Sequence, residues 1–230
     1  SDAPADGPYQ RAALAEDAAA LLDALGHRQA ALVGHDWGAV AATGAAILAP
    51  QRVARLATMA VPHGPALASA FLTNYAQQRR SWYMFFFQTP LAEMAVAHDD
   101  FAFLEHLWRD WSPGWAWPAE EMAALKDTFR QPGVLAAALG YYRHTFNPAL
   151  QRAELAEAQG RTQLEPVTVP ALYVHGARDG CIGVELCAGM AALFPAGLRE
   201  LVVPDAGHFV HQERPEVVNA ALVEFLAPLR

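Results

Sequence analysis

The chain of 230 residues is long enough to bury a substantial core, and one domain with an insertion fits this length better than several domains. A hydrophobic fraction of 53% beside a charged fraction of 17% excludes a disordered chain. The net charge of −8, with no basic cluster beyond Arg79-Arg80, argues against a nucleic-acid partner.

The sequence carries no sign of a membrane span or a metal centre. No apolar run reaches the roughly 18 residues that cross a bilayer. The N-terminus, with Asp2 and Asp6, does not resemble a basic-then-apolar signal peptide. Cys181 and Cys187 lie six positions apart, which fits neither a zinc knuckle nor a redox pair, so we expect two buried thiols. We therefore predict a cytoplasmic protein without a membrane partner, metal or cofactor.

Helix and strand patterns alternate at the start of the chain. Apolar residues recur at helical spacing over residues 11–25, and Gly26 ends that pattern. The apolar run 30–33 is typical of a buried parallel strand. A glycine-flanked turn then leads into a helix expected over 39–48, and a second strand is expected over 53–61.

The pattern of apolar residues changes after residue 65. Residues 66–160 show no convincing strand, and they hold every tryptophan except Trp37. Strand patterns return at 169–175 and 198–203, and helices are expected over 184–193 and 215–226.

This alternation predicts an α/β fold with a mostly parallel sheet and helices on its faces. The helical middle block is too long and too apolar to be a linker. We expect residues 1–65 and 161–230 to form the core and residues 66–160 to form a cap over the ends of the strands.

The segment Gly34-His35-Asp36-Trp37-Gly38 is the first candidate for chemistry. Its position between a strand and a helix is where a nucleophile elbow belongs. We expect the two backbones to approach so closely that neither glycine has space for a Cβ atom. The alternative is an ordinary strand-to-helix turn in which the aspartate caps the helix N-terminus. A carboxylate is ionised at neutral pH, so Asp36 can attack a carbon that bears a leaving group or a strained ring. The expected product is an alkyl ester on the enzyme, which points to epoxides or haloalkanes.

Hydrolysis of such an ester needs a general base, for which His208 is the best candidate. It lies in a loop after the last expected strand, whereas the runner-up His211 lies where a helix begins. Asp179 follows the preceding strand at the same end of the sheet and is the candidate acid that orients the imidazole. Asp205 is its rival, although it is awkwardly close in sequence to His208.

Three segments together resemble the epoxide hydrolase branch of the α/β-hydrolases: 34–38, Asp179-Gly180-Cys181 and Gly207-His208-Phe209. The cap segments 82–90 and 140–143 resemble the two tyrosine segments of that family. The resemblance implies that Tyr83 and Tyr142 hold the epoxide oxygen and protonate it as the ring opens. If so, their hydroxyls should converge above Asp36.

The remaining candidate site residues are those expected to contact substrate. They are His35, Trp37, Trp82, Phe86 and Phe209. The expected partners are a small apolar epoxide or haloalkane and water. Haloalkane dehalogenases share the aspartate and Trp37, so that activity is the main alternative, and a non-catalytic ligand-binding protein is the second.

The chain departs from the family pattern at its N-terminus. The family places several strands and an HGxP loop ahead of the helix that begins here near Arg11, and His63-Gly64-Pro65 comes after the elbow. We therefore expect a truncated sheet of four parallel strands with the 30–33 strand at an edge. A second copy of the chain in a homodimer is one way to cover that edge.

Overall fold

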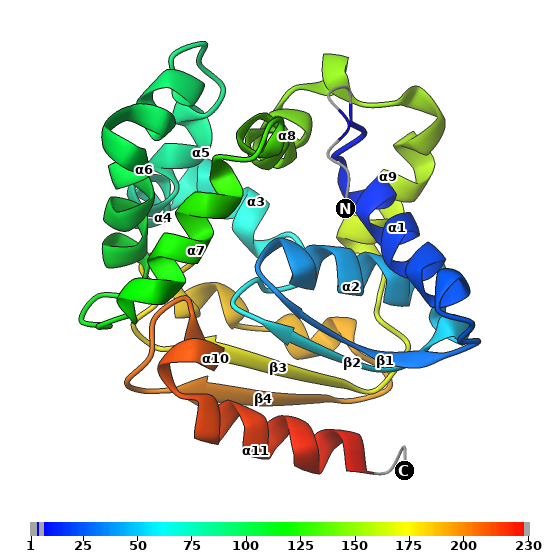
Figure 1. Cartoon of the computed structure of the whole chain (residues 1–230). Coiled ribbons are helices and arrows are strands. Elements are labelled where there is room, and N and C mark those ends of the chain that lie inside the picture. Colours follow the sequence, from blue (N-terminus) through cyan, green and yellow to red (C-terminus); the bar gives the residue numbers. More distant parts are fainter. Residues whose placement is uncertain (1–3, 5–6, 228–230) are drawn as a thin grey trace.

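Four parallel strands form the centre of the computed structural model, which describes residue 4 and residues 7–227 (Figure 1). They are β1 (Ala30–His35), β2 (Val53–Met59), β3 (Ala171–Gly176) and β4 (Leu198–Val203), arranged in the order β1-β2-β3-β4. The register pairs Leu32 with Leu56, Leu56 with Ala171, and Ala171 with Leu198. The parallel sheet is thus confirmed, and β1 lies at its edge, where Val33 is 47% exposed.

Helices cover both faces of this sheet (Figure 1). On one face lie α1 (Arg11–Ala24), α2 (Trp37–Leu48) and α9 (Ala156–Leu164), and on the other lie α10 (Val210–Glu213) and α11 (Pro215–Leu226). Side chains of a strand alternate between faces, so Tyr173 packs with the α2 core while its neighbours Leu172 and Val174 pack with the α11 core.

The first six helices after β2 gather at the carboxyl end of the strands (Figure 1). They are α3 (Ala66–Thr73), α4 (Tyr75–Arg80), α5 (Trp82–Phe86), α6 (Ala92–Trp111), α7 (Ala119–Phe129) and α8 (Val134–Phe146). Non-helical backbone angles interrupt α6 at residues 98–101. Residues 66–160 contain no strand, as predicted, but the division of the chain into a core and a cap stays a prediction.

A buried glutamine ties these helices to the sheet. Gln77 in α4 donates to the carbonyl oxygen of Cys181 at 2.8 Å, and its own side-chain oxygen accepts from the backbone N–H of Gly183 at 3.0 Å. The loop after β3 is therefore fixed to α4. Any residue in this loop keeps a defined position relative to the helices above the sheet.

Some expected elements differ in the structure. The helix predicted over 184–193 is wrong, because two short 3₁₀ turns, Val184–Cys187 and Met190–Leu193, occupy that segment. Gly189 between them has a φ of 80°, which an α-helix cannot include. The strand predicted over 53–61 stops at Met59, since Ala60 has a φ of 67°.

Within the described part of the chain, no helix is both long enough and apolar enough to cross a bilayer. Both cysteines are buried and unbonded to each other, as predicted.

Candidate active site

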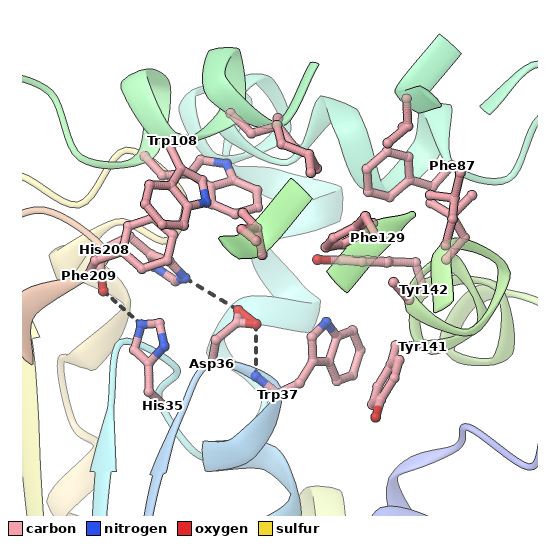
Figure 2. A pocket seen from close by; sticks show the side chains of 18 residues that line it. His35, Asp36, Trp37, Phe87, Trp108, Phe129, Tyr141, Tyr142, His208 and Phe209 are labelled. Carbon is pink, nitrogen blue, oxygen red and sulfur yellow. Dashed lines mark hydrogen bonds and ion pairs between the residues drawn. The ribbon is translucent and has the colours of Figure 1, made fainter. Parts of the chain in front are cut away.

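Asp36 lies in a strained turn between β1 and α2. Its φ of 52° and ψ of −121° are rare for a residue with a side chain, and such a conformation costs roughly 1–3 kcal/mol. The backbone N–H of Trp37 donates to Oδ1 of Asp36 at 2.8 Å. The carboxylate therefore caps the first turn of α2 and stands at the carboxyl edge of the sheet (Figure 2).

The two glycines of this turn have different functions. A Cβ atom on Gly34 would lie 2.2 Å from the carbonyl oxygen of Gly38, so only glycine fits at position 34. A Cβ atom on Gly38 would meet nothing within 4 Å. The expectation that both positions lack space for a side chain is thus wrong for Gly38, which contributes its backbone to the close approach.

The side chains of Asp36, His208 and Asp179 are in contact, with His208 between the two carboxylates. Nε2 of His208 lies 3.3 Å from Oδ2 of Asp36, and Nδ1 of His208 lies 2.9 Å from Oδ2 of Asp179. Oδ1 of Asp179 accepts from the backbone N–H groups of Cys181 and Ile182 at 2.7 and 2.8 Å. Every oxygen of the Asp179 carboxylate is therefore engaged, and its orientation toward His208 is fixed.

Neither Asp205 nor His211, the rival candidates for acid and base, forms a hydrogen bond with Asp36 or His208 among the residues described. Asp205 is exposed, and no hydrogen bond joins it to His208 among the residues described. His211 lies near the start of α10, and its ring centroid is 4.5 Å from that of His35. The ring nitrogen Nε2 of His35 donates to the carbonyl oxygen of His208 at 2.9 Å, and so it braces the loop that carries His208.

A buried polar chain behind Asp179 was missed by sequence reasoning. Nε2 of His175 donates to the carbonyl oxygen of Ile182 at 3.0 Å and lies 3.5 Å from Oδ2 of Asp179. The hydroxyl of Tyr173 donates to the other ring nitrogen of His175 at 2.6 Å. Two polar residues at alternate positions of an otherwise apolar strand were the available signal, because a fully buried strand rarely carries them without a partner.

The electrostatics of the site favour an ion pair between Asp36 and His208 before substrate reacts. Burial on its own would raise the pKa of Asp36, but the hydrogen bond and charge of His208 and the N–H of Trp37 hold it below its usual value. Burial opposes protonation of His208, yet the sulfur of Cys181 and the carboxylates of Asp179 and Asp36 raise its pKa well above 6.5. Because both ring nitrogens face carboxylates, His208 is held as the cation beside an ionised Asp36.

The neighbouring His35 is held neutral. Burial, followed by the charge of His208, lowers the pKa of His35 to about 4. It therefore acts as a neutral hydrogen-bond donor to the His208 loop across the physiological pH range.

A cavity of about 320 Å³ opens above Asp36 (Figure 2). Three of the residues expected to contact substrate line it: His35, Trp37 and Phe209. Most of the rest of its wall is apolar or aromatic, with Phe87, Trp108, Trp111, Phe129 and Leu139 among the residues that sequence reasoning did not single out. The site can thus hold an apolar ligand directly over an ionised carboxylate.

Trp82 and Phe86 do not line this cavity, contrary to expectation. Phe86 stacks on Phe103 of α6 with ring centroids 5.8 Å apart, and Trp82 packs beside both and is 45% exposed. The short helix α5 turns these two side chains toward α6, and Phe87 faces the cavity in their place.

The two tyrosines lie next to each other but differ in their hydroxyl contacts. Their ring centroids are 5.7 Å apart. Tyr142 lines the cavity, and in Figure 2 its hydroxyl points into the space above Asp36 and Trp37. The hydroxyl of the fully buried Tyr83 lies 3.2 Å from Sγ of Cys181, and Tyr83 is not part of the cavity wall. The expected convergence of both hydroxyls above Asp36 is therefore wrong for Tyr83, whose hydroxyl contacts Cys181, and only Tyr142 lines the cavity as expected.

Burial is the main cause that raises the pKa of each tyrosine. The sulfur of Cys181 and the charge of Asp36 raise the pKa of Tyr83 further, and the charge of Asp36 raises that of Tyr142. Both remain protonated phenols that can donate a hydrogen bond.

One group of potential metal ligands lies inside this site. Single ligand atoms of Asp179, Cys181 and His208 lie within 4.8 Å of one another. Nδ1 of His208 already donates to Asp179, however, and Oδ1 of Asp179 accepts two backbone N–H groups. A metal ion here would have to break the hydrogen bond that orients the imidazole, so these residues do not fit a metal centre.

The glycine contacts predict a difference in stability between two single substitutions. We expect Gly34→Ala to lower the free energy of unfolding by about 3 kcal/mol, because its methyl group would overlap the backbone of Gly38. Gly38→Ala is the matched control and should be neutral or stabilising, since alanine favours helix formation by about 1 kcal/mol over glycine. Urea unfolding followed by circular dichroism measures both. Equal stability of the two variants would contradict the packing described for this turn.

The ion pair predicts the titration of His208. Its imidazole should titrate well above 6.5 in the wild-type protein, and Asp36→Asn should lower that pKa, because it removes a negative charge that stabilises the protonated ring. Proton NMR of the ring resonances as a function of pH measures the change. Asp205→Asn, at an exposed position, is the control and should leave the titration in place. A wild-type pKa at or below 6.5 would contradict the ion pair.

Comparison with known proteins agrees with this geometry. A model of the alpha/beta hydrolase fold family matches residues 1–215. Epoxide hydrolase 4 of Mus musculus is 29% identical over 233 residues, which cover 98% of this chain and 62% of that protein. Epoxide hydrolase 3 of Xenopus tropicalis is 30% identical, with 98% of this chain and 60% of that protein covered. The chain thus spans about three-fifths of the length of these curated relatives.

Solved structures show the same likeness. An epoxide hydrolase of Bacillus megaterium in complex with an inhibitor superposes with a TM-score of 0.80 at 27% identity, over 95% of this chain and 76% of that one. A structure from work on epoxide hydrolases in metagenomes from hot environments gives a TM-score of 0.81 at 28% identity, over 98% and 77% of the two chains. This chain therefore belongs to the α/β-hydrolase fold family, and within that family it is epoxide hydrolase-like.

Proposed function

We propose that this protein hydrolyses epoxides to vicinal diols through a covalent ester on Asp36, with His208 and Asp179 activating water. The observation that carries the proposal is an aspartate at the strained strand-to-helix turn, in contact with a histidine that a second aspartate orients. A carboxylate in this position needs no base for its own attack. The names of the relatives support an epoxide as the electrophile.

In the first step, one oxygen of Asp36 attacks a ring carbon of the epoxide from behind. Oδ1 is held by the N–H of Trp37, so Oδ2 is the oxygen free to form the new carbon–oxygen bond once it leaves His208. The bond between that carbon and the ring oxygen breaks, and the oxygen receives the electron pair. An alkoxide is a poor leaving group unless a donor neutralises it.

Tyr142 is the donor best placed to do this. It stays protonated at neutral pH, because burial and the charge of Asp36 raise its pKa, and it lines the cavity above Asp36. Tyr83 is the second proposed donor. In the structure its hydroxyl contacts Sγ of Cys181, and a thiol is a weak hydrogen-bond partner. Replacing this contact by a hydrogen bond to the substrate oxygen therefore requires little free energy.

In the second step, water attacks Cγ of the ester. Ester formation removes the negative charge of Asp36, so the pKa of His208 falls. The imidazole cation gives its second proton to the phenolate that the first step leaves on Tyr142, and the neutral ring can then act as the base. Asp179 stabilises the cation that forms when His208 accepts a proton from water. The N–H of Trp37 donates to Oδ1 as that atom becomes negative. The bond from Cγ to the ester oxygen then breaks, and the leaving oxygen takes the proton of the new carboxyl group, so that Asp36 is again a carboxylate beside the His208 cation. The diol leaves with an oxygen atom that belonged to Asp36.

The surroundings of the site fit an apolar substrate. The wall of the cavity is mainly aliphatic and aromatic, and most of it comes from residues 66–160. In this proposal those residues form a cap that excludes water from the ester until the cavity admits one molecule. The natural substrate is then a small apolar epoxide met in the cytoplasm.

The proposal predicts unequal effects of two neighbouring tyrosines. With aryl and alkyl epoxides, the wild-type chain should form diols, and Tyr142→Phe should lower the rate of ester formation about 10²-fold, because it removes the proton donor. Tyr141→Phe should lower this rate far less, since the Tyr141 hydroxyl points away from Asp36 (Figure 2). Rapid-mixing measurement of ester formation, followed by the change in tryptophan fluorescence, separates this step from hydrolysis.

Haloalkanes assayed in parallel are the control for the competing activity. Release of halide without diol formation from any epoxide would refute the epoxide assignment and favour a dehalogenase. Equal rates for the two tyrosine variants would remove Tyr142 from the mechanism.

A further inference from the structure

The loop that carries His208 is packed between the end of β3 and the end of α6. A Cβ atom on Gly207 would lie 2.5 Å from Cα of Ser112, the residue that follows α6. A Cβ atom on Gly176, the last residue of β3, would lie 2.1 Å from the carbonyl oxygen of Gly207. Backbone therefore packs on backbone at both sides of this loop, and a change at the end of α6 is felt at His208.

The carbonyl oxygen of Trp111, the last residue of α6, binds two loops of the site. It accepts from the N–H of His208 at 3.1 Å and from the N–H of Gly180 at 2.9 Å. Because Gly180 follows Asp179, one oxygen atom fixes the backbone of the histidine and the backbone beside its orienting acid. Trp111 also lines the large cavity. The end of α6 thus belongs both to the cavity wall and to the support of His208.

Two buried side chains, Ser112 and Glu213, bind the backbone on either side of His208. The hydroxyl of Ser112 accepts from the N–H of Phe209 at 3.1 Å and donates to Oε1 of Glu213 at 2.7 Å. Both carboxylate oxygens of Glu213 lie 2.9 Å from the backbone nitrogen of Gly207, which donates to them. The residues before and after His208 are therefore joined through one hydroxyl and one carboxylate, which together form the Ser112–Glu213 clamp.

Stability alone does not explain a carboxylate at this position. Glu213 is 9% exposed, and none of the ion pairs in the described part of the chain involves it. A buried carboxylate without a cation beside it carries a desolvation penalty that an apolar residue would avoid. Its advantage over a neutral acceptor is that it forms stronger hydrogen bonds with Ser112 and Gly207. Those bonds fix the backbone that carries His208.

We propose that Ser112 and Glu213 are positioning residues for hydrolysis of the ester. This inference rests on the proposed function and deepens it. Attack of Asp36 on an epoxide needs no base, so the first step tolerates a displaced imidazole. The second step needs Nε2 of His208 within hydrogen-bond reach of the water that attacks Cγ. Since a displacement of about 1 Å can lower a rate roughly 10²-fold, loss of the clamp slows the second step selectively.

Separate measurement of the two steps by rapid mixing tests this inference. Ser112→Ala and Glu213→Leu should slow ester hydrolysis about 10- to 100-fold and leave the rate of ester formation close to the wild-type value. The alkyl-enzyme should then accumulate, and mass spectrometry of the intact protein detects it. Glu213→Gln keeps one acceptor oxygen, so it should slow hydrolysis less than Glu213→Leu does.

A double variant tests whether the two residues act as one unit. Ser112 and Glu213 share a hydrogen bond, so their effects on ester hydrolysis should not multiply. The double variant Ser112→Ala/Glu213→Leu should be little slower than the slower of the two single variants. Losses that multiply would show two unrelated defects and would overturn the clamp.

Ser69→Ala and Glu216→Gln are the matched controls. They change an exposed serine of α3 and an exposed glutamate of α11, both outside the cavity, and should keep the wild-type rates of both steps. Thermal melting of every variant checks that it folds. If Glu213→Leu does not fold, Ser112→Ala and Glu213→Gln carry the test. Folded variants that hydrolyse the ester at the wild-type rate, or that slow both steps equally, would overturn the inference.

Proton NMR at a fixed pH separates this inference from the proposed function. In the wild-type protein, the Nδ1 proton that His208 donates to Asp179 should give a resolved low-field resonance, because a buried hydrogen bond slows exchange with water. Ser112→Ala should broaden or remove this resonance, and Ser69→Ala should keep it. That result supports the clamp even if no epoxide is hydrolysed. Diol formation together with an unchanged resonance in folded Ser112→Ala would overturn the clamp and leave the epoxide hydrolase proposal standing.

Discussion

His208 lies between two carboxylates, and the rest of the site depends on this arrangement. Asp179 contacts one ring nitrogen and Asp36 the other, so the buried imidazole is held as a cation and Asp36 as an anion. Three buried charged groups are unfavourable unless each finds partners. The surrounding structure supplies them: the N–H of Trp37 for Asp36, two N–H groups of the loop after β3 for Asp179, and the neutral His35 as a brace behind His208. The parallel sheet makes this possible because β1, β3 and β4 end at the same edge.

The same arrangement explains why the ion pair is compatible with base catalysis. A permanently protonated histidine could not activate water. In the proposed mechanism, the substrate itself removes the charge that holds the second proton, because the ester of Asp36 is neutral. The protein thus needs no separate device to switch His208 between its two states. The strained backbone of Asp36 contributes by holding the carboxylate away from the sheet, where the ligand and the imidazole can both reach it.

The sequence predicted the sheet and the three aligned groups because these follow from local rules. A short apolar run, a glycine-flanked turn and an apolar helix determine where Asp36 lies, and polar residues after later strands must come to the same edge. The cavity wall could not be predicted in this way. Packing against Phe103 of α6 keeps Phe86 and Trp82 out of the cavity. The five residues of α5 are too few for a periodicity that would predict this. The contact of Tyr83 with Cys181 likewise joins segments 98 positions apart.

The central claim is that Asp36 becomes an ester and that water attacks the enzyme instead of the substrate. The most direct measurement is a single turnover of an epoxide, with enzyme in excess, in water enriched in heavy oxygen. Mass spectrometry then follows the label in the diol and in the peptide that contains Asp36. We expect the label in the Asp36 side chain and an unlabelled diol. Label in the diol during this first turnover, with Asp36 unlabelled, would contradict it and would mean that water opens the ring directly.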